Sequence, residues 1–445
     1  MNVDVLVVGA GPAGLSAAAE LRRLGVESVL VADREAEAGG IPRHSWHTGY
    51  GLRDLHRVMT GPAYARALAS AAVAVGAEVR LGTTVTCCVP GATGGFGVTM
   101  TSARGIETVG AQVVLLATGC RERPRTARLV PGDRPAGVMT TGELQQRVYL
   151  GNERLPGRAL VVGAEHVSFS AAVTLAHAGA RVVALVTEYE RQQSYAAFRV
   201  GAALRWRVPV WTSTAVSRVA GRERLEGVEV ADLRGGATRF VPCDTLVFTA
   251  DWIPDHELAR HAGLDVDPGT RGPTVDTRLR TSAAGVFAAG NLVHAAETAD
   301  IAALSGRHAA RQIAAALGAA GPVAAALGAA GPVAAALGAA GPIAAPDGAG
   351  PTVASVPVRV EPPLRWISPN AIAVAIGGRA VPPPLGRFVL RSQEFGRVAR
   401  LVVRQDGRVL GRSGPVRLIP GRPVHLGAGW LARVDPAGGA VYVAP

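Results

Sequence analysis

The sequence of 445 residues contains no lysine, and all 46 of its basic residues are arginine. A chain without lysine cannot form a Schiff base with a substrate or with pyridoxal phosphate. It also lacks the lysine that a phosphate-binding P-loop requires. Aromatic residues make up only 4% of the chain, so we expect cores built largely from valine, leucine, isoleucine and alanine.

Cysteine is also scarce, and the four cysteines form no C-x-x-C pair. This spacing disfavours a redox-active disulfide and a local iron–sulfur or zinc cluster, so we expect no metal site. We interpret the adjacent Cys87 and Cys88 as small, buried apolar residues. The pattern is typical of a reducing compartment and predicts a cytoplasmic protein.

The formal net charge is +12. The arginines are dispersed, which disfavours nucleic-acid binding and leaves an acidic partner, an anionic substrate or a featureless basic surface. The N-terminus has no basic segment followed by a long apolar stretch, so we expect no signal peptide. Residues 313–346 are uncharged but mostly alanine and are interrupted by Gly-Pro pairs, so we expect no membrane span there.

Two stretches of the chain have the pattern of a strand, a glycine turn, a helix and a second strand. The first has these elements at 4–8, 15–24 and 28–32, and the second at 159–162, 168–177 and 181–186. Each pattern is typical of a βαβ unit. The sequence therefore predicts an α/β protein with two Rossmann-like dinucleotide-binding domains.

Two further strand patterns end in glycine turns, at 113–119 and 285–291. A helix at about 297–317 would close the first domain, which would place the second domain as an insertion within it. We therefore predict a discontinuous first domain at 1–122 and 250–316, and an inserted second domain at 123–249.

The last part of the chain differs from the rest in composition and in its pattern of apolar residues. Residues 317–346 hold three copies of a decapeptide rich in alanine, glycine and proline, and we interpret 317–350 as a low-complexity linker. Short apolar pieces alternate with glycine and proline turns over 351–445, which predicts a small β-rich domain. It has one histidine, His425, and no cysteine, so we expect partner docking or a purely structural role.

The strongest motif is Gly9-Ala10-Gly11-Pro12-Ala13-Gly14, between the first strand and the first helix. Such a backbone turns sharply at its first glycine, admits a pyrophosphate at the second and packs helix against strand at the third. The helix N-terminus then offers free N–H groups to the phosphates. An acidic residue at the end of the next strand accepts ribose hydroxyls. The predicted contacts are Gly9, Gly11, Pro12, Ala13, Gly14, Asp33 and Arg34.

Later segments decide between FAD and NAD. Gly39-Gly40 follows the acidic residue, Ala117-Thr118-Gly119 ends a strand, and 281–291 ends another. With the first motif, they resemble the two-dinucleotide-domain flavoproteins of the glutathione-reductase-like superfamily, over about residues 1–316. The resemblance implies bound FAD, with contacts from Gly40, Ile41, Arg43, Thr118, Gly119, Gly290, Asn291, Glu297 and Thr298. Asn291 stands where that family has an aspartate for the ribityl chain, and an amide can also accept and donate hydrogen bonds.

A narrower resemblance rests on further segments. They include Gly39–His44, Thr60–Tyr64, Arg121–Arg125, Pro131–Pro135, Thr140–Gly142, Asp251–Leu258 and Gly290–Asp300. These segments are similar to the FAD-binding subunits of heteromeric dehydrogenases of the opine-oxidase, hydrogen-cyanide-synthase and dye-linked proline-dehydrogenase type. The resemblance implies an amine, imino-acid or amino-acid substrate, and a partner that is itself a second flavoprotein subunit. Several members carry a cysteine-rich iron–sulfur element, which this chain lacks.

The glycine turn of the second domain is degenerate and reads Gly163-Ala164-Glu165-His166-Val167-Ser168. Glu165 puts a side chain and a negative charge where a pyrophosphate would bind. Glu188, at the end of the next strand, would suit an NAD ribose only if the pyrophosphate fitted. We therefore predict that NAD(P) does not bind tightly and interpret this domain as a retained scaffold, with a working NAD(P) site as the alternative.

Candidates for catalysis come from the resemblance. Residues after the Gly-Gly pair approach the flavin ring in that superfamily, which implies that His44 exchanges a proton with flavin or substrate. A structural hydrogen-bonding role is the alternative for His44. Residues 294–300 would start a helix whose positive end stabilises reduced flavin, with Glu297 as a second catalytic candidate or a helix cap. Three arginines follow the mid-chain strand: Arg121, Arg123 and Arg125. We weigh three roles for them, namely binding a phosphate, fixing a loop, or lying on the solvated surface.

These observations predict an FAD-dependent oxidoreductase, a dehydrogenase or oxidase subunit that passes electrons to a partner or another non-nicotinamide acceptor. One alternative is a free-standing NAD(P)H-dependent flavin reductase of the same superfamily. The other is a non-catalytic, FAD-containing assembly subunit. Rapid bleaching of the flavin by NADH or NADPH would distinguish the reductase from the other two.

Overall fold

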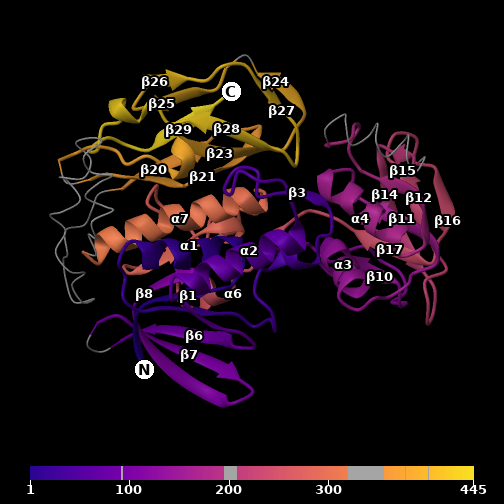
Figure 1. The fold of residues 1–445 in the computed structure, drawn as a ribbon. Coiled ribbons are helices and arrows are strands. Elements are labelled where there is room, and N and C mark those ends of the chain that lie inside the picture. Colours follow the sequence, from indigo (N-terminus) through magenta and orange to yellow (C-terminus); the bar gives the residue numbers. More distant parts are fainter. Residues whose placement is uncertain (92–93, 195–207, 319–354, 376, 399) are drawn as a thin grey trace. The chain divides into compact units, whose positions relative to one another are not determined.

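The computed structural model describes residues 1–91, 94–194, 208–318, 355–375, 377–398 and 400–445. The predicted linker at 317–350 lies outside the described residues except for its first two. The chain forms two compact units (Figure 1). Unit 1 comprises residues 1–43, 48–120 and 254–445, and unit 2 comprises residues 44–47 and 121–253. The chain passes between them through β9 (Cys120–Arg121) and β18 (Ile253–Pro254).

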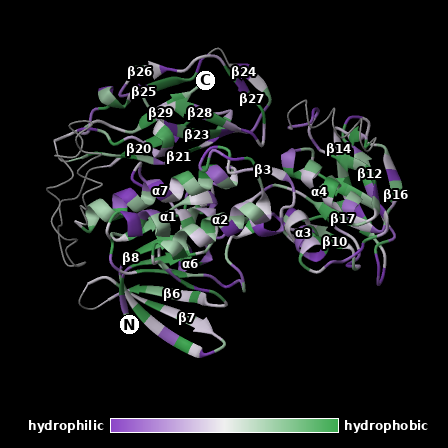
Figure 2. Ribbon diagram, in the orientation of Figure 1, coloured by the Kyte–Doolittle hydropathy of each residue, from purple (hydrophilic) through white to green (hydrophobic). Residues whose placement is uncertain are grey.

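Unit 1 is built on a seven-stranded sheet in the order β5-β2-β1-β8-β7-β6, with β19 also paired to β8. Its strands are β1 (Asn2–Val8), β2 (Val29–Ala32), β5 (Glu78–Arg80), β6 (Thr84–Pro90), β7 (Phe96–Ser102), β8 (Gly105–Leu116) and β19 (Val286–Ala288). β1 runs parallel to both β2 and β8. Its residues Val5, Leu6 and Val7 are fully buried, as expected for a strand covered on both faces. Figure 2 shows hydrophobic residues interspersed with more polar ones along the outer strands β6 and β7.

The helices of unit 1 cover this sheet. They are α1 (Pro12–Arg23), α2 (Gly61–Ala74), α6 (Glu257–His261) and α7 (Ala299–Ala316), and a two-stranded ribbon is formed by β3 (Thr48–Tyr50) and β4 (Met59–Thr60). α1 and α7 pack closely, because a Cβ at Gly306 would lie 2.0 Å from the carbonyl oxygen of Ala13. The last helix, predicted at about 297–317, spans Ala299–Ala316, so its start lies two residues after the predicted one. Thr298 has an extended ψ of 160° and is the N-cap residue, so Glu297 lies in the preceding loop.

The C-terminal part of unit 1 is made of strands with its own hydrophobic core, which includes Phe388 and Trp430. One sheet has the order β22-β20-β29-β25-β26, a second β21-β23-β28, and β24 pairs with β27. The bounds are β20 (Ser355–Val360), β21 (Leu364–Ser368), β22 (Ala371–Ala373), β23 (Arg387–Ser392), β24 (Gly396–Val398), β25 (Val402–Gln405), β26 (Arg408–Arg412), β27 (Val416–Leu418), β28 (Pro423–Gly427) and β29 (Val441–Ala444). The backbone N–H of Asn370 donates to the carbonyl of Val275, which ties this part to the nucleotide fold.

Unit 2 has a five-stranded parallel sheet in the order β10-β17-β11-β12-β13 and a three-stranded antiparallel sheet, β14-β15-β16. The strands are β10 (Val138–Thr140), β11 (Gly157–Val162), β12 (Ala180–Val186), β13 (Val210–Trp211), β14 (Thr214–Ala220), β15 (Gly227–Asp232), β16 (Thr238–Pro242) and β17 (Thr245–Phe248), and the helices are α3 (Thr141–Tyr149) and α4 (His166–His177). The predicted α/β class is confirmed. No helix within the described ranges is long and apolar enough to cross a membrane.

Candidate functional site

The first glycine turn joins β1 to α1 and has little room for side chains at two of its glycines. Gly9 has a φ of +109°, and a Cβ there would lie 2.5 Å from the carbonyl oxygen of Ala117. A Cβ at Gly14 would lie 1.9 Å from the carbonyl oxygen of Gly9. Gly11 differs from both, because no atom lies within 4 Å of its Cβ position. The turn therefore has no room for a side chain at Gly9 or Gly14, whereas the space beside Gly11 is open.

The N-terminus of α1 lies at this opening and has no cap. Gly11 is the N-cap residue, no side chain caps it, and the first turn contains no acidic residue. Pro12 has no N–H group, and the N–H groups of Ala13 and Gly14 have no acceptor within the helix. The positive end of the helix therefore faces open space. This arrangement fits a bound pyrophosphate.

Asp33 follows β2 and organises the same turn. Its Oδ2 accepts a hydrogen bond from the backbone N–H of Ala10 at 2.5 Å, and its Oδ1 accepts one from Glu35 at 2.8 Å. Each carboxylate oxygen retains a second lone pair for a ribose hydroxyl. Gly40, with a φ of +61°, packs beside Gly11, so a Cβ there would lie 3.0 Å from the Cα of Gly11. The structure thus brings Asp33 and Gly40 to the glycine turn, as an adenosine diphosphate site requires.

The other residues predicted after β2 are more exposed. Arg34 is 67% exposed and lies 3.4 Å from the carboxylate of Asp255. Ile41 is 44% exposed, and the Arg43 guanidinium donates to the Glu37 carbonyl and to Glu35. Their contacts with a cofactor stay predictions.

Two predicted segments, Thr118-Gly119 and Gly290-Asn291, are held by side-chain hydrogen bonds to backbone groups of the protein. The Thr118 hydroxyl donates to the carbonyl of Asp255 at 2.8 Å, and Gly119 has a φ of +76°. Gly290 reaches the glycine turn, because a Cβ there would lie 2.7 Å from the Cβ of Ala13. The Asn291 side chain binds the backbone of the loop instead, donating to the Glu297 carbonyl at 3.0 Å and accepting from its N–H at 3.1 Å.

The start of α7 carries an ion pair that the sequence analysis missed. Asp300 is 2% exposed, and its carboxylate lies 3.0 Å from the guanidinium of Arg53. The Thr298 hydroxyl donates to the same carboxylate. A carboxylate in the first turn of a helix is stabilised by the helix dipole, so Asp300 could have been noticed in the sequence. Its pairing with Arg53 could not, because the two residues lie far apart in the chain.

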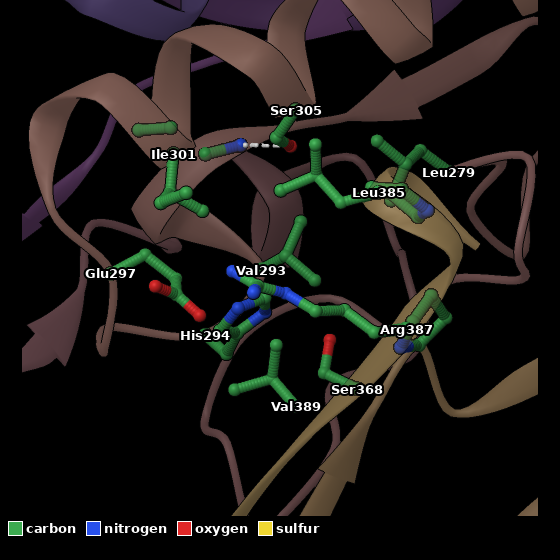
Figure 3. A pocket seen from close by; sticks show the side chains of 14 residues that line it. Leu279, Val293, His294, Glu297, Ile301, Ser305, Ser368, Leu385, Arg387 and Val389 are labelled. Atoms are coloured by element: carbon green, nitrogen blue, oxygen red, sulfur yellow. Dashed lines mark hydrogen bonds between the residues drawn. The ribbon is translucent and has the colours of Figure 1, made fainter. Parts of the chain in front are cut away.

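A pocket of about 490 Å³, counting space open to solvent, lies between the start of α7 and the C-terminal strands of unit 1 (Figure 3). Its apolar wall includes Leu279, Val293, Ile301, Ala302, Pro369, Pro384, Leu385 and Val389. Its polar groups are His294, Glu297, Ser305, Ser368 and Arg387. Gly290 lines this pocket and also touches Ala13, so the pocket adjoins the glycine turn.

Glu297, predicted as a catalytic and FAD-contacting residue, lies in this pocket. Its side chain is 8% exposed, and its Oε1 lies 3.5 Å from Nε2 of His425. Burial opposes ionisation, but His425, His294 and Arg387 together hold the pKa of Glu297 below its ordinary value. Burial lowers the pKa of His294 to about 4, against the opposing charge of Glu297. At neutral pH the pocket therefore holds a carboxylate beside an uncharged imidazole.

His44, the other catalytic candidate, ends the short 3-10 helix η1 (Ile41–His44) and is 4% exposed. It is grouped with unit 2, whereas the glycine turn belongs to unit 1. Its proton-transfer role stays a prediction.

The second glycine turn, in unit 2, is filled by protein groups. The Ser168 hydroxyl donates to Oε2 of Glu165 at 2.8 Å and accepts from the Glu165 backbone N–H at 3.2 Å. The Thr249 hydroxyl lies 3.4 Å from the same Oε2. A Cβ at Gly163 would lie 2.7 Å from Oε2, so the carboxylate folds back over the turn. Burial raises the pKa of Glu165, while Ser168 and Arg128 oppose that rise.

A second buried carboxylate, also missed by the sequence analysis, lies at the start of α3. Glu122 is 6% exposed and accepts hydrogen bonds from the backbone N–H groups of Gly142 at 2.8 Å and Ala250 at 3.2 Å. Burial raises its pKa to about 7. Arg128 donates to the carbonyls of Thr249 and Ala250, which fixes the neighbouring loop.

The predicted arginine group serves mainly to hold loops. The Arg123 guanidinium lies 2.9 Å from the carboxylate of Asp251. Arg125 donates to the carbonyls of Val130 and Pro131. Of the three interpretations of this group, loop fixation describes Arg123 and Arg125.

The four cysteines are all free thiols. Burial raises the pKa of Cys88 to about 11 and that of Cys243 to about 12. Buried thiols with such pKa values are poor nucleophiles at neutral pH.

The fold and the glycine turn define a dinucleotide-binding α/β protein, and comparison with known proteins gives its family, which is one of flavin oxidoreductases. The family model for pyridine nucleotide-disulphide oxidoreductases matches residues 3–308. The chain belongs to this family, whose members bind FAD and typically also NAD(P).

Individual relatives point to two kinds of flavoprotein. The ferredoxin–NAD(+) reductase subunit of a benzene 1,2-dioxygenase system from Pseudomonas putida is 34% identical over 193 residues, which are 42% of this chain and 44% of that protein. One of the opine oxidase subunits from Agrobacterium tumefaciens is 28% identical over 317 residues, covering 65% of this chain and 61% of the relative. The chain therefore spans less than two thirds of the length of either relative.

Among solved structures, thioredoxin reductase from T. acidophilum has a TM-score of 0.57 at 23% sequence identity. The similarity covers 70% of this chain and 97% of that one. It shows a shared fold. The C-x-x-C pair of a redox-active disulfide is missing from the sequence of this chain.

Proposed function

We propose that this chain is an FAD-dependent dehydrogenase or oxidase subunit that acts on an amine, imino acid or amino acid. In this proposal the electrons leave through a partner subunit or another non-nicotinamide acceptor. The observation that carries it is the contrast between two helix N-termini. The N-terminus of α1 is uncapped and open at Gly11, whereas that of α4 is covered by the Glu165 carboxylate.

Gly11, Ala13, Gly14 and Asp33 would hold the FAD, the first three at its pyrophosphate and Asp33 at its ribose. When bound, FAD supplies a two-electron acceptor. The chain contributes the backbone N–H groups and positive helix end at the phosphates. Gly290 packs against Ala13 and links this site to the pocket that contains Glu297.

The same contrast supports an acceptor other than NAD(P). A dinucleotide bound at α4 would have to displace the Glu165 carboxyl group from the Ser168 hydroxyl. A partner subunit is supported by the opine oxidase relative, whose name marks it as one component of a larger enzyme.

A second candidate is an NAD(P)H-dependent reductase that delivers electrons to a ferredoxin. Glu188, just after β12, stands where an acid would bind the ribose of NAD. The relative from the benzene dioxygenase system is itself named a ferredoxin–NAD(+) reductase subunit. The third possibility, a non-catalytic FAD-containing subunit, predicts that neither a nicotinamide nor an amine reduces the flavin.

Anaerobic reduction of the purified, FAD-loaded protein tests the proposal. The flavin absorbance is followed after mixing with NADH, with NADPH, or with amines and amino acids, in the presence and absence of a co-purified partner subunit. The proposal predicts bound FAD, slow bleaching by both nicotinamides, and faster bleaching by an amine or amino acid. Bleaching by NADH at an enzymatic rate would instead identify a reductase.

A further inference from the structure

The pocket beside α7 contains buried polar atoms that lack a protein partner. Ser368 Oγ and His294 Nδ1 have no hydrogen-bond partner among the described residues, and Glu297 Oε1 has only the long 3.5 Å contact with Nε2 of His425. The side chain of Glu297 is 8% exposed and Ser368 is 1% exposed. Leaving a buried polar group unsatisfied is costly, so native proteins do it seldom and often at functional sites. All three atoms belong to residues that line one pocket.

The pocket also holds one anion and one cation that do not neutralise each other by direct contact. In Figure 3 the Arg387 side chain extends from β23 toward His294 and Glu297. The charge of Arg387 contributes to the lowered pKa of Glu297. Across the described part of the chain, however, the Arg387 guanidinium makes no ion pair within 4.0 Å and no hydrogen bond. Its donors therefore remain free for a ligand.

The remaining walls are aliphatic. Val293, Ile301, Leu385 and Val389 point into the same space in Figure 3. Leu385 has a φ of +57°, a conformation that leucine adopts only when its surroundings enforce it. A ligand for this pocket needs a compact branched or cyclic hydrocarbon body.

We propose that this pocket binds the zwitterion of a small aliphatic amino acid. Its ammonium group donates to Oε1 of Glu297, its carboxylate accepts from the Arg387 guanidinium, and its side chain packs on the aliphatic wall. The uncharged His294 adds a polar contact without repelling the ammonium group. A simple amine would leave the Arg387 guanidinium without a partner, and a simple carboxylic acid would leave Glu297 Oε1 with only its 3.5 Å contact to His425.

This inference deepens the proposed function by naming the class of small molecule, and it rests on that function only for the oxidation of the bound amino acid. Binding and oxidation can be measured separately. If L-valine binds but neither it nor any other amine, imino acid or amino acid reduces the flavin, the pocket is a ligand site and the proposed substrate class fails. If amino acids reduce the flavin but none binds in this pocket, the proposed function stands and this inference fails.

Calorimetric titration of the FAD-loaded full chain tests the binding step with three matched probes. L-valine carries both charges, isobutylamine lacks the carboxylate, and isovalerate lacks the ammonium group. We expect L-valine to bind at least about tenfold more tightly than either single-charge analogue, since each charged hydrogen bond is worth about that factor. Equal binding of the three probes, or no binding of L-valine at millimolar concentration, would overturn the inference.

Variants locate the site. Glu297→Gln and Arg387→Gln should each weaken L-valine binding at least about tenfold. Glu394→Gln and Arg404→Gln remove exposed charges from the same C-terminal part and should leave binding unchanged. FAD absorbance and thermal unfolding confirm that each variant is folded. Because Glu297 and Arg387 lie on different elements, one variant still tests the site if the other does not fold. Unchanged binding in both folded pocket variants would contradict the assignment.

Discussion

The Ser168 hydroxyl donates a hydrogen bond to the Glu165 carboxylate at 2.8 Å, at the N-terminus of α4. This bond holds a carboxylate of the protein at the place where a dinucleotide-binding domain normally binds a phosphate. The equivalent end of α1 has no such group. One chain therefore contains two versions of the same supersecondary unit, one open to an anion and one closed by its own carboxyl group.

Replacing Glu165 by glycine should open the second turn. We expect Glu165→Gly to raise the rate of flavin bleaching by subsaturating NADH or NADPH about tenfold or more, because a charge and a side chain leave the phosphate position. The lost cap should cost about 1 kcal/mol of stability. Stopped-flow absorbance measures the rate. Glu143→Gln, which removes an acid from the first turn of α3, is the control, and an unchanged rate in Glu165→Gly would argue against a blocked site.

Two glycines of the first turn should respond differently to the same added methyl group. Gly11→Ala meets open space at an ordinary φ of −82°, so the protein should fold normally but lose FAD affinity. Gly14→Ala places a Cβ 1.9 Å from the Gly9 carbonyl oxygen, and we expect it to lose about 1–3 kcal/mol of stability or more. Urea unfolding and flavin content separate the two effects. Full FAD affinity in Gly11→Ala would show that the phosphates lie elsewhere.

Glu122 should make the stability of unit 2 depend on pH. Burial raises its folded-state pKa from 4.5 to about 7, so the folded state binds the proton more tightly than the unfolded state. The stabilisation is fully present below the unfolded pKa and is lost as pH rises toward 7. The shift corresponds to roughly 3 kcal/mol across this window.

The matching measurement compares wild type with Glu122→Gln by urea unfolding from pH 4 to pH 8. The variant keeps one acceptor oxygen but presents an NH2 group to the other backbone N–H, so it should be less stable than wild type at low pH. The free-energy difference between the two proteins should shrink as pH rises through the window. A difference that stays constant with pH would mean that Glu122 is not buried in its folded state.

The buried thiols should be inert in the native protein. With pKa values of about 11 and 12, Cys88 and Cys243 should react with a thiol reagent at pH 8 far more slowly than in the unfolded chain. Mass spectrometry of the labelled peptides identifies which cysteines react. Fast labelling of Cys243 in the folded protein would contradict its described burial.

The sequence was sufficient to predict the glycine turns and the α/β class, because these depend on local patterns. Gly9, Gly11 and Gly14 occur at the spacing expected between one strand and one helix. In the second turn, Glu165 stands where this pattern has its middle glycine. The cofactor roles assigned from the resemblance stay predictions. The start of α7 was predicted to within two residues, because the backbone is extended at Thr298 and the helix begins at Ala299.

The pocket and the two missed acids could not be predicted in the same way. Glu297 meets His425, and Asp300 meets Arg53, only because segments distant in sequence pack together. Burial also decides the ionisation of Glu122 and His294, and burial is a property of the folded chain. No single-sequence pattern distinguishes these residues from exposed ones of the same type.

Equilibrium titration of the flavin-free protein with FAD and then with NADH tests the central claim most directly. The account predicts one FAD bound per chain, with Gly11 and Asp33 required, and no tight binding of NADH until Glu165 is replaced. A chain that binds no FAD, or that binds NADH tightly with Glu165 intact, would contradict it.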